Sequence, residues 1–123
     1  MRDIKFRAWD KDRQSMFTNP KFVEFLVDKN GVLTARNYYV DGKYRNLPIM
    51  QFTGLLDKNG VEIYEGDIVK LQYVSQPLEV NYSTVTASFI MGREHRFMPL
   101  SDLEVIGNIY ENKELLEADQ KEK

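Results

Sequence analysis

The segment QFTGLLDKNGVEIYEGDIVK, residues 51–70, contains two reverse turns with apolar stretches before, between and after them. Asn59-Gly60 is a strong hairpin signal, since a tight two-residue hairpin turn needs positive φ at both central residues. Glu65-Gly66-Asp67 predicts a second turn, in which glycine relaxes the backbone and the aspartate carboxylate accepts hydrogen bonds from nearby amides. The segment therefore predicts short strands joined by tight turns.

Alternating apolar and polar residues predict strands on both sides of this segment. Residues 3–17 predict an N-terminal hairpin with a polar turn at 10–14, and residues 49–53 predict the strand that leads into the central segment. Further strands are expected at 61–64, 68–74, 78–82, 85–91, 96–100 and 103–110. Short strands separated by turns about every 8–12 residues favour a small barrel or a coiled sheet over alternating strands and helices.

The region between the N-terminal hairpin and the central segment is less regular. Asp28-Lys29-Asn30-Gly31 predicts a turn of the same type as the one at 57–60. The apolar residues at 22–27, before that turn, could form a strand or a single helical turn, and β-branching favours the strand. Residues 32–35 return from the turn, and a further short hairpin is expected at 38–44.

The C-terminal residues differ in character from the rest. Asn112 predicts the N-cap of a short helix that carries Leu115 and Leu116, and the acidic residues in the first turn suit the helix dipole. From Asp119 onward the chain has no apolar residue, and we expect it to fray.

The chain has 123 residues, of which 42% are hydrophobic and 29% charged, a balance typical of one globular domain. It contains no cysteine, which excludes a disulfide framework, a thiolate zinc site and a cysteine nucleophile. The N-terminus lacks the apolar core of a signal peptide, and no apolar run is long enough to span a bilayer. We therefore expect a soluble protein of the cytoplasm with no membrane partner.

Charge is distributed unevenly along the chain, whose net charge is −2. Residues 1–50 carry ten Lys/Arg and six Asp/Glu, residues 51–110 carry four and eight, and residues 111–123 carry three and five. The resulting net charges of +4, −4 and −2 can mark a basic binding face. The favoured interpretation is that folding intermixes the two halves and cancels much of the field.

Few residues could carry out chemistry. His95 is the only histidine in the sequence, and its place in a polar turn favours a solvated surface residue over a metal ligand or a base. Glu62, Glu65 and Asp67 could together bind a hard cation such as Mg²⁺ through carboxylate oxygens. A turn with a side-chain-to-backbone hydrogen bond needs the same kind of residues, and this structural interpretation is favoured.

Aromatic residues raise the question of nucleic-acid binding. Arg93 and Arg96, near Phe89 and Phe97, resemble a basic and aromatic patch that could stack on single-stranded bases. Two arginines do not distinguish such a patch from ordinary surface charge. Trp9 is expected in the core rather than on a base-stacking platform, because its large apolar surface favours burial.

Three segments together resemble the YopX family: MRDIKFRAWD at 1–10, MQFTGLLDKNGVEIYEGDIVK at 50–70 and LEVIGNIYENKELL at 103–116. These are small proteins encoded mainly by bacteriophages, prophages and other mobile elements of bacteria. The positions that match the family's pattern are Arg7, Trp9, Asp10, Thr53, Gly54, Asp57, Gly60, Glu65, Gly66 and Asp67.

The resemblance implies a mainly β fold with coiled or bifurcated antiparallel sheets and a small barrel-like C-terminal part, to which the residues at 112–117 add a short C-terminal helix. The expected organisation is a single β-rich domain over 1–110. Within it, residues 1–50 form N-terminal hairpins and residues 51–110 form the barrel-like part. The short helix and a frayed charged tail occupy 111–123.

The resemblance implies no specific activity, and we assign no catalytic, cofactor-binding or metal-binding residue. The favoured function is a phage-encoded accessory protein of the host cytoplasm, a non-enzymatic module that binds a protein partner or self-assembles into a homo-oligomer. The alternative is a nucleic-acid-binding small β-barrel that uses the basic 1–50 half with Arg93 and Arg96. A metal-dependent hydrolase built on Glu62, Glu65 and Asp67 is the least favoured hypothesis.

Overall fold

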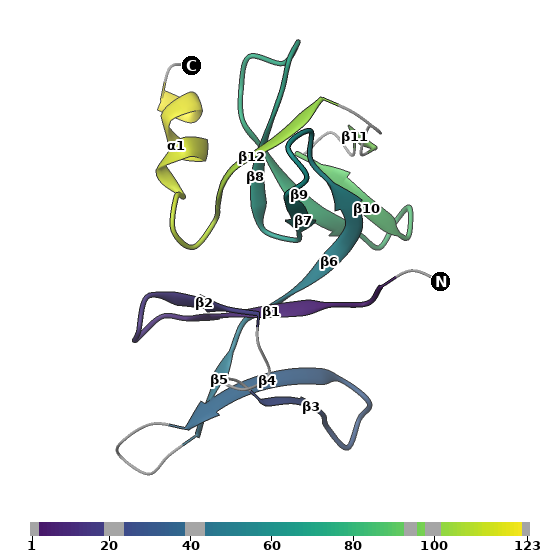
Figure 1. Ribbon diagram of the computed structural model, residues 1–123, viewed down its shortest axis with the longest axis vertical. Coiled ribbons are helices and arrows are strands. Elements are labelled where there is room, and N and C mark those ends of the chain that lie inside the picture. Colours follow the sequence, from purple (N-terminus) through teal and green to yellow (C-terminus); the bar gives the residue numbers. More distant parts are fainter. Residues whose placement is uncertain (1–2, 19–23, 39–43, 93–95, 98–101, 122–123) are drawn as a thin grey trace. The chain divides into compact units, whose positions relative to one another are not determined.

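The computed structural model describes residues 3–18, 24–38, 44–92, 96–97 and 102–121. Figure 1 shows strands joined by turns and a short helix near the C-terminus. All strand pairs among the described residues are antiparallel, as expected for strands whose connections are mostly a few residues long. The prediction of a mainly β fold with antiparallel sheets and a C-terminal helix is confirmed.

The chain forms two compact units, which are described separately. The N-terminal unit comprises Lys5–Gln51, and the C-terminal unit comprises Met1–Ile4 together with Phe52–Lys123. The boundary between the units lies next to the predicted internal division at residue 50. The expectation that 1–110 is a single domain stays a prediction.

The N-terminal unit contains a hairpin and a three-stranded sheet. β1 (Phe6–Asp10) pairs with β2 (Ser15–Phe17), which confirms the hairpin predicted at 3–17. β3 (Glu24–Val27), β4 (Leu33–Tyr38) and β5 (Tyr44–Leu47) form the sheet in that order, so a strand rather than a helical turn precedes the 28–31 turn. The tip of the hairpin predicted at 38–44 lies outside the described residues.

Apolar side chains from both sheets form the core of this unit. Ala8, Ala35 and Leu47 are buried together, and the half-buried Phe17, Phe25 and Ile49 pack against them. Trp9 is buried, so its predicted place in the core is confirmed.

Strand β6 (Ile49–Leu56) takes part in both units. Its first residues pair with β1, and its later residues pair with β7 (Glu62–Tyr64). The register with β7 shifts between Phe52 and Leu56, and Gly54 in that interval has φ of +89°, a conformation that glycine adopts without steric cost. One strand that serves two ladders is the kind of bifurcation that the family resemblance implies.

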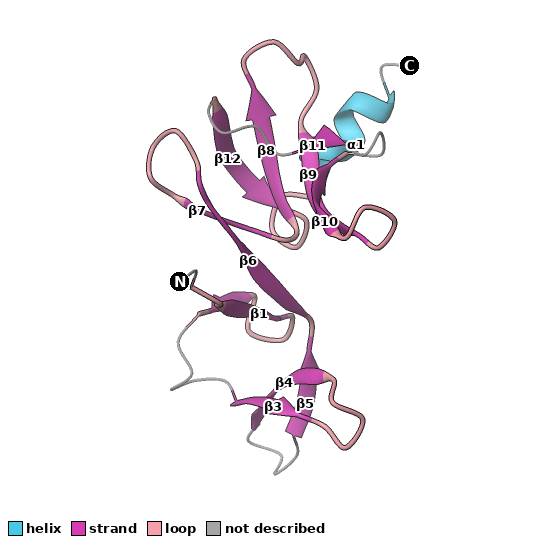
Figure 2. Ribbon diagram, turned by 90° about the vertical axis from the view of Figure 1, so that its right-hand side faces the viewer, coloured by secondary structure: helices cyan, strands magenta, loops and turns pink. Residues whose placement is uncertain are grey.

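The C-terminal unit is built on a five-stranded sheet in the order β11-β10-β9-β8-β12. The strands are β8 (Asp67–Leu71), β9 (Leu78–Ser83), β10 (Ser88–Met91), β11 (Arg96–Phe97) and β12 (Leu103–Asn108). Figure 2 shows the sheet curving as a half-barrel. Its core consists of Ile63, Val69, Leu78, Val80, Met91 and Leu103.

Three predicted strands include residues that form turns in the structure. β8 ends at Leu71, because the chain turns there and the Val74 N–H donates to the Leu71 carbonyl at 3.3 Å. The segment 85–91 begins as a turn, in which Ala87 has φ of 51°, and the strand starts only at Ser88. β12 ends at Asn108, whose side-chain oxygen accepts hydrogen bonds from the next turn.

The predicted helix is confirmed as α1 (Glu114–Lys121), which extends beyond Asp119, where we expected fraying. The predicted N-cap is wrong. Asn112 Oδ1 accepts a hydrogen bond from the Asn108 N–H at 3.2 Å, so the side chain faces back to the end of β12. The Asn112 carbonyl instead accepts from the Leu115 N–H at 2.9 Å. Neither α1 nor another helix in the described residues is long and apolar enough to cross a membrane.

Candidate functional site

The same five residues, Asp-Lys-Asn-Gly-Val, occupy positions 28–32 and 57–61. The first set joins β3 to β4, and the second joins β6 to β7. In both turns the aspartate N–H donates to the valine carbonyl, at 2.9 Å in 28–32 and 2.8 Å in 57–61. The glycine N–H donates to the aspartate carbonyl at 3.0 Å in each. Both predicted turns are therefore confirmed.

The aspartate side chain holds each turn in the same way. Asp28 Oδ1 accepts hydrogen bonds from the N–H groups of Asn30 and Val32, at 2.8 and 3.0 Å. Asp57 Oδ1 accepts the equivalent bonds, at 2.8 and 2.9 Å, from Asn59 and Val61. A short carboxylate that binds the backbone just after it is the reason that aspartate favours turns.

The backbone of these turns differs from the predicted two-residue hairpin turn. Gly31 and Gly60 have φ of +81° and +82°, but Asn59 is not among the described residues with positive φ, so that part of the prediction is wrong. The aspartate oxygen binds two backbone N–H groups at once, and this favours a longer turn in which only the glycine is left-handed.

The 57–61 turn is docked on the edge of β12. The second carboxylate oxygen of Asp57, Oδ2, accepts a hydrogen bond from the Val105 N–H at 3.0 Å. The Lys58 N–H donates to the Leu103 carbonyl at 2.8 Å. Because β12 is an outer strand of its sheet, the turn satisfies edge groups that would otherwise be open to another chain. Figure 2 shows the loop between β6 and β7 beside β12.

Docking changes the electrostatic environment of Asp57, which is only 7% exposed. Burial raises the pKa of this carboxyl group. The backbone N–H groups of Val105, Val61 and Asn59, with the positive charge of Lys58, outweigh that effect, so the net pKa lies below its ordinary value of 3.8. Asp57 is therefore held in the ionised form that accepts all three hydrogen bonds.

Lys58 makes a further contact through its side chain. Its Nζ lies 3.3 Å from Glu104 Oε2, on the residue between the two β12 groups that the turn binds. The two side chains are 51% and 40% exposed, so the ion pair stabilises the fold by no more than about 0.5 kcal/mol.

The 28–32 turn has the same groups, but no strand among the described residues is docked on it. Asp28 and Lys29 are exposed. Within the described part of the chain, no hydrogen bond reaches Asp28 Oδ2, and none is made by the Lys29 N–H. Apolar residues flank the turn, with Val27 69% and Val32 55% exposed. The 28–32 turn therefore exposes Asp28 Oδ2 and the Lys29 N–H, whose counterparts in the 57–61 turn are bound to β12.

The predicted acidic cluster is divided among separate contacts. Asp67 is buried, and its Oδ2 accepts a hydrogen bond from the Tyr64 N–H at 2.8 Å, as the turn interpretation of this residue predicts. Glu62 Oε1 accepts a bond from the Tyr64 hydroxyl at 3.3 Å. Glu65 is half-buried, has an interaction partner and precedes Gly66, whose φ is +83°. Nowhere in the described ranges do three or more acidic or histidine residues group to hold a metal.

The other positions that match the family's pattern lie in strands and turns. Asp10 is buried and accepts hydrogen bonds from the N–H and the Nη1 of Arg13, at 3.1 and 2.8 Å. Thr53 Oγ1 donates to the Ile63 carbonyl at 2.8 Å, next to the register shift in β6. Arg7 is half-buried and has an interaction partner.

Two predicted candidates cannot be placed. His95 and Arg93 lie outside the described residues, and Arg96 is described only as part of the backbone of β11. The predicted basic and aromatic patch therefore stays a prediction.

The sequence analysis missed the groups on β12 that the 57–61 turn binds. The Val105 N–H and the Leu103 carbonyl are backbone groups, which carry no sequence signal of their own. It also missed the significance of Asp28, although the repeated pentapeptide was a signal that could have revealed it.

Fold and turns together define a small antiparallel β protein with a bifurcated strand, a half-barrel and acidic residues that fasten its turns. The chain belongs to the YopX family, whose model, described as YopX protein, matches residues 5–117. The resemblance seen in the sequence is thereby confirmed.

Two crystal structures are similar to the chain. Protein EF1440 from Enterococcus faecalis is 30% identical, with a TM-score of 0.66 over 94% of this chain and 99% of that one. Protein yopX from Bacillus subtilis is 22% identical, with a TM-score of 0.56 over 91% and 97% of the two chains, and this likeness shows the fold alone. No curated protein sequence matches the chain.

Proposed function

We propose that the chain is a non-enzymatic interaction module that binds another protein or a second copy of itself. The observation that carries the proposal is the exposure of three apolar residues at the end of the β3–β4 hairpin, Leu26, Val27 and Val32. Single exposed apolar residues are ordinary, but a group of them on one hairpin marks a surface that gains free energy when a partner covers it.

The roles of the acidic residues support the same proposal. The buried carboxylates of Asp10, Asp57 and Asp67 each accept hydrogen bonds from backbone amides nearby. A carboxylate used in this way stabilises a turn. The proposal places the module in the cytoplasm of a bacterial host as an accessory protein of a phage or prophage. Identifying the genes that lie beside its own gene would test the phage or prophage origin.

Light scattering after size-exclusion chromatography, with pull-down from a host lysate, tests the proposal. Wild-type protein is expected to self-associate or to retain a specific partner. A variant with Val27→Ser and Val32→Ser should lose that association, while Val85→Ser, at another exposed turn, should keep it. A strict monomer that retains nothing specific, or an association that both variants keep, would contradict the proposal.

Nucleic-acid binding is the second candidate, and the division of charge between the units favours it. The N-terminal unit carries nine Lys/Arg and five Asp/Glu, a net charge of +4, whereas the rest of the chain carries eight and fourteen, a net charge of −6. The two units thus carry net charges of opposite sign. Such a basic unit could attract phosphates.

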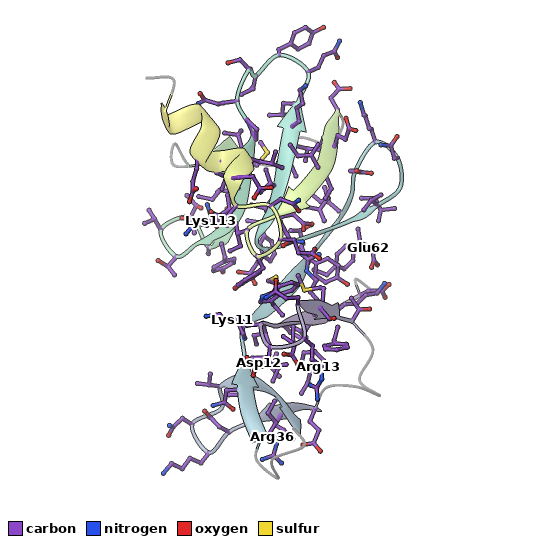
Figure 3. All side chains as sticks on the ribbon, turned by 90° about the vertical axis from the view of Figure 1, so that its left-hand side faces the viewer. Lys11, Asp12, Arg13, Arg36, Glu62 and Lys113 are labelled. Carbon is purple, nitrogen blue, oxygen red and sulfur yellow. The ribbon has the colours of Figure 1, made fainter. Side chains whose placement is uncertain are left out.

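Two arginines of the N-terminal unit are already paired. Arg13 Nη1 lies 2.8 Å from Asp10 Oδ2, and Arg36 Nε lies 3.0 Å from Glu24 Oε2. Figure 3 shows Lys11, Asp12 and Arg13 on the turn after β1 and Arg36 on β4.

Binding to DNA or RNA should weaken steeply with salt, because phosphate contacts release counterions. If neither is retarded in a gel at low salt, this second candidate fails.

A further inference from the structure

We propose that the 28–32 turn binds the edge of an extended strand in a partner protein, in the way that the 57–61 turn binds β12. The bound strand has an acidic residue between the two residues whose backbone groups the turn binds. This inference rests on the proposed function and names the kind of surface that the partner presents.

The 57–61 turn shows what such binding requires. Asp57 Oδ2 and the Lys58 N–H bind, respectively, the N–H of Val105 and the carbonyl of Leu103. These two β12 groups are two residues apart, as neighbouring groups on one edge of a strand are. The Lys58 ammonium group then reaches the residue between them, Glu104.

The 28–32 turn holds the corresponding groups in the same arrangement. The pentapeptides are identical, the internal hydrogen bonds agree to within about 0.1 Å, and the two glycines have nearly the same φ. Asp28 Oδ2 and the Lys29 N–H therefore point outward as the groups of Asp57 and Lys58 do. The part of the chain that the structure describes supplies no partner for either group.

The hydrogen-bonding and charged groups of the turn determine what kind of molecule can bind there. Asp28 Oδ2 accepts from an N–H and the Lys29 N–H donates to a carbonyl, so the occupant is a backbone edge rather than an anion. The Lys29 ammonium group favours an acidic side chain between those two groups and disfavours a basic one.

The apolar residues beside the turn are not part of what the docked turn uses. Leu56 and Val61 are still 57% and 48% exposed with β12 in place, and Val27 and Val32 have the equivalent positions beside the 28–32 turn. In a second copy of this chain β12 is already covered by its own turn, so that strand is not the occupant.

A peptide tests the inference directly. The probe is a blocked peptide of residues 102–109, DLEVIGNI, added to the full-length ¹⁵N-labelled protein. The Lys29 amide signal is expected to shift with peptide concentration, while the Lys58 amide, already bound to Leu103, stays in place. A peptide with lysine in place of its glutamate should bind about two- to fivefold more weakly, because it loses an ion pair.

Variants of the protein separate binding from folding. Asp28→Asn keeps an oxygen for the turn but presents an amide NH₂ to the partner's N–H, and should weaken binding by about tenfold or more. Lys29→Glu should reverse the preference between the two peptides. Lys11→Glu, an equal change of charge at another exposed turn of the N-terminal unit, should leave binding unchanged.

Three outcomes would overturn the inference: no shift of the Lys29 amide, full binding by Asp28→Asn, or shifts confined to the neighbourhood of Lys58. A partner protein that is retained by both wild type and Asp28→Asn would overturn the inference and leave the proposed function standing. A protein that binds the peptide but associates with no protein at all would contradict the proposed function instead.

Discussion

The 28–32 and 57–61 turns are an internal comparison, in which identical residues are placed in two different surroundings. Their local hydrogen bonds and glycine conformations are nearly the same, so the pentapeptide determines its own backbone. β12 supplies one of the hydrogen bonds that lower the pKa of Asp57, from the Val105 N–H, and the turn itself supplies the others, from Val61 and Asn59. A local sequence therefore determines the shape of the turn, and a distant strand determines how much that turn stabilises the fold.

The largest expected difference is between Asp57→Asn and Asp28→Asn. Either amide can still accept bonds within its turn, but Asp57→Asn places an NH₂ group against the Val105 N–H in a buried site. This should lower the free energy of unfolding by about 2–3 kcal/mol, as expected for a buried donor without an acceptor. Asp28→Asn should change it by less than about 0.5 kcal/mol. Urea unfolding of both variants measures the difference, and equal losses would remove the distinction between the turns.

Alanine at the two glycines should have equal effects. Gly31 and Gly60 both have positive φ, and a Cβ added at either meets nothing within 4 Å, so the cost is backbone strain alone. Each substitution should lower the free energy of unfolding by about 1 kcal/mol. Urea unfolding again provides the measurement. A loss at Gly60 that is much larger than the loss at Gly31 would mean that docking on β12 tightens the turn itself.

The pH dependence of stability should show the contribution of the docked Asp57. The pKa of Asp57 is lower in the folded state than its ordinary value of 3.8, so the folded state binds this proton less readily than the unfolded state does. The stabilisation is therefore present above pH 3.8 and is lost as the pH falls through 3.8 to the lower folded pKa. Unfolding measured across this range should show the loss in wild type and Asp28→Asn but not in Asp57→Asn.

Glu79 provides a control for this measurement. Burial raises its pKa above the ordinary value of 4.5, so its contribution has the opposite sign and falls as the pH rises through 4.5. Glu79→Gln removes that contribution and isolates the loss caused by Asp57. If the acid-induced loss persists in the double variant with Asp57→Asn, another carboxylate is responsible.

The smallest expected difference is between Lys58→Ala and Lys29→Ala. Lys58 loses only an exposed ion pair with Glu104, which costs no more than about 0.5 kcal/mol. Lys29 has no ion pair within the described residues, and its removal should not change stability measurably. Thermal unfolding at low and high salt checks the first value, since screening should abolish it. A Lys58 effect that persists at high salt would come from packing of its alkyl chain.

Sequence patterns predicted the turns and most strands, because these depend on neighbouring residues. In both pentapeptides the aspartate and the Asn-Gly pair indicate a turn, although the two turns lie in different surroundings. The docking of Asp57 on Val105 could not be predicted in this way, because the two residues are 48 positions apart and the bond joins a side chain to a backbone amide. The strand predicted at 85–91 was partly wrong for a related reason. Val85 is apolar but lies exposed in a turn, where residue type alone is misleading.

The two roles of β6 restrict how the length of the chain can vary. Met50 and Phe52 are buried and Gln51 is half-buried, so the alternation of sides continues through the point where β6 passes from one ladder to the other. An insertion or deletion of one residue here would exchange the inner and outer side chains of one ladder, whereas a change of two residues would preserve them. Insertions and deletions at this point are therefore expected to involve even numbers of residues, whereas those in the surface loops can be of any length.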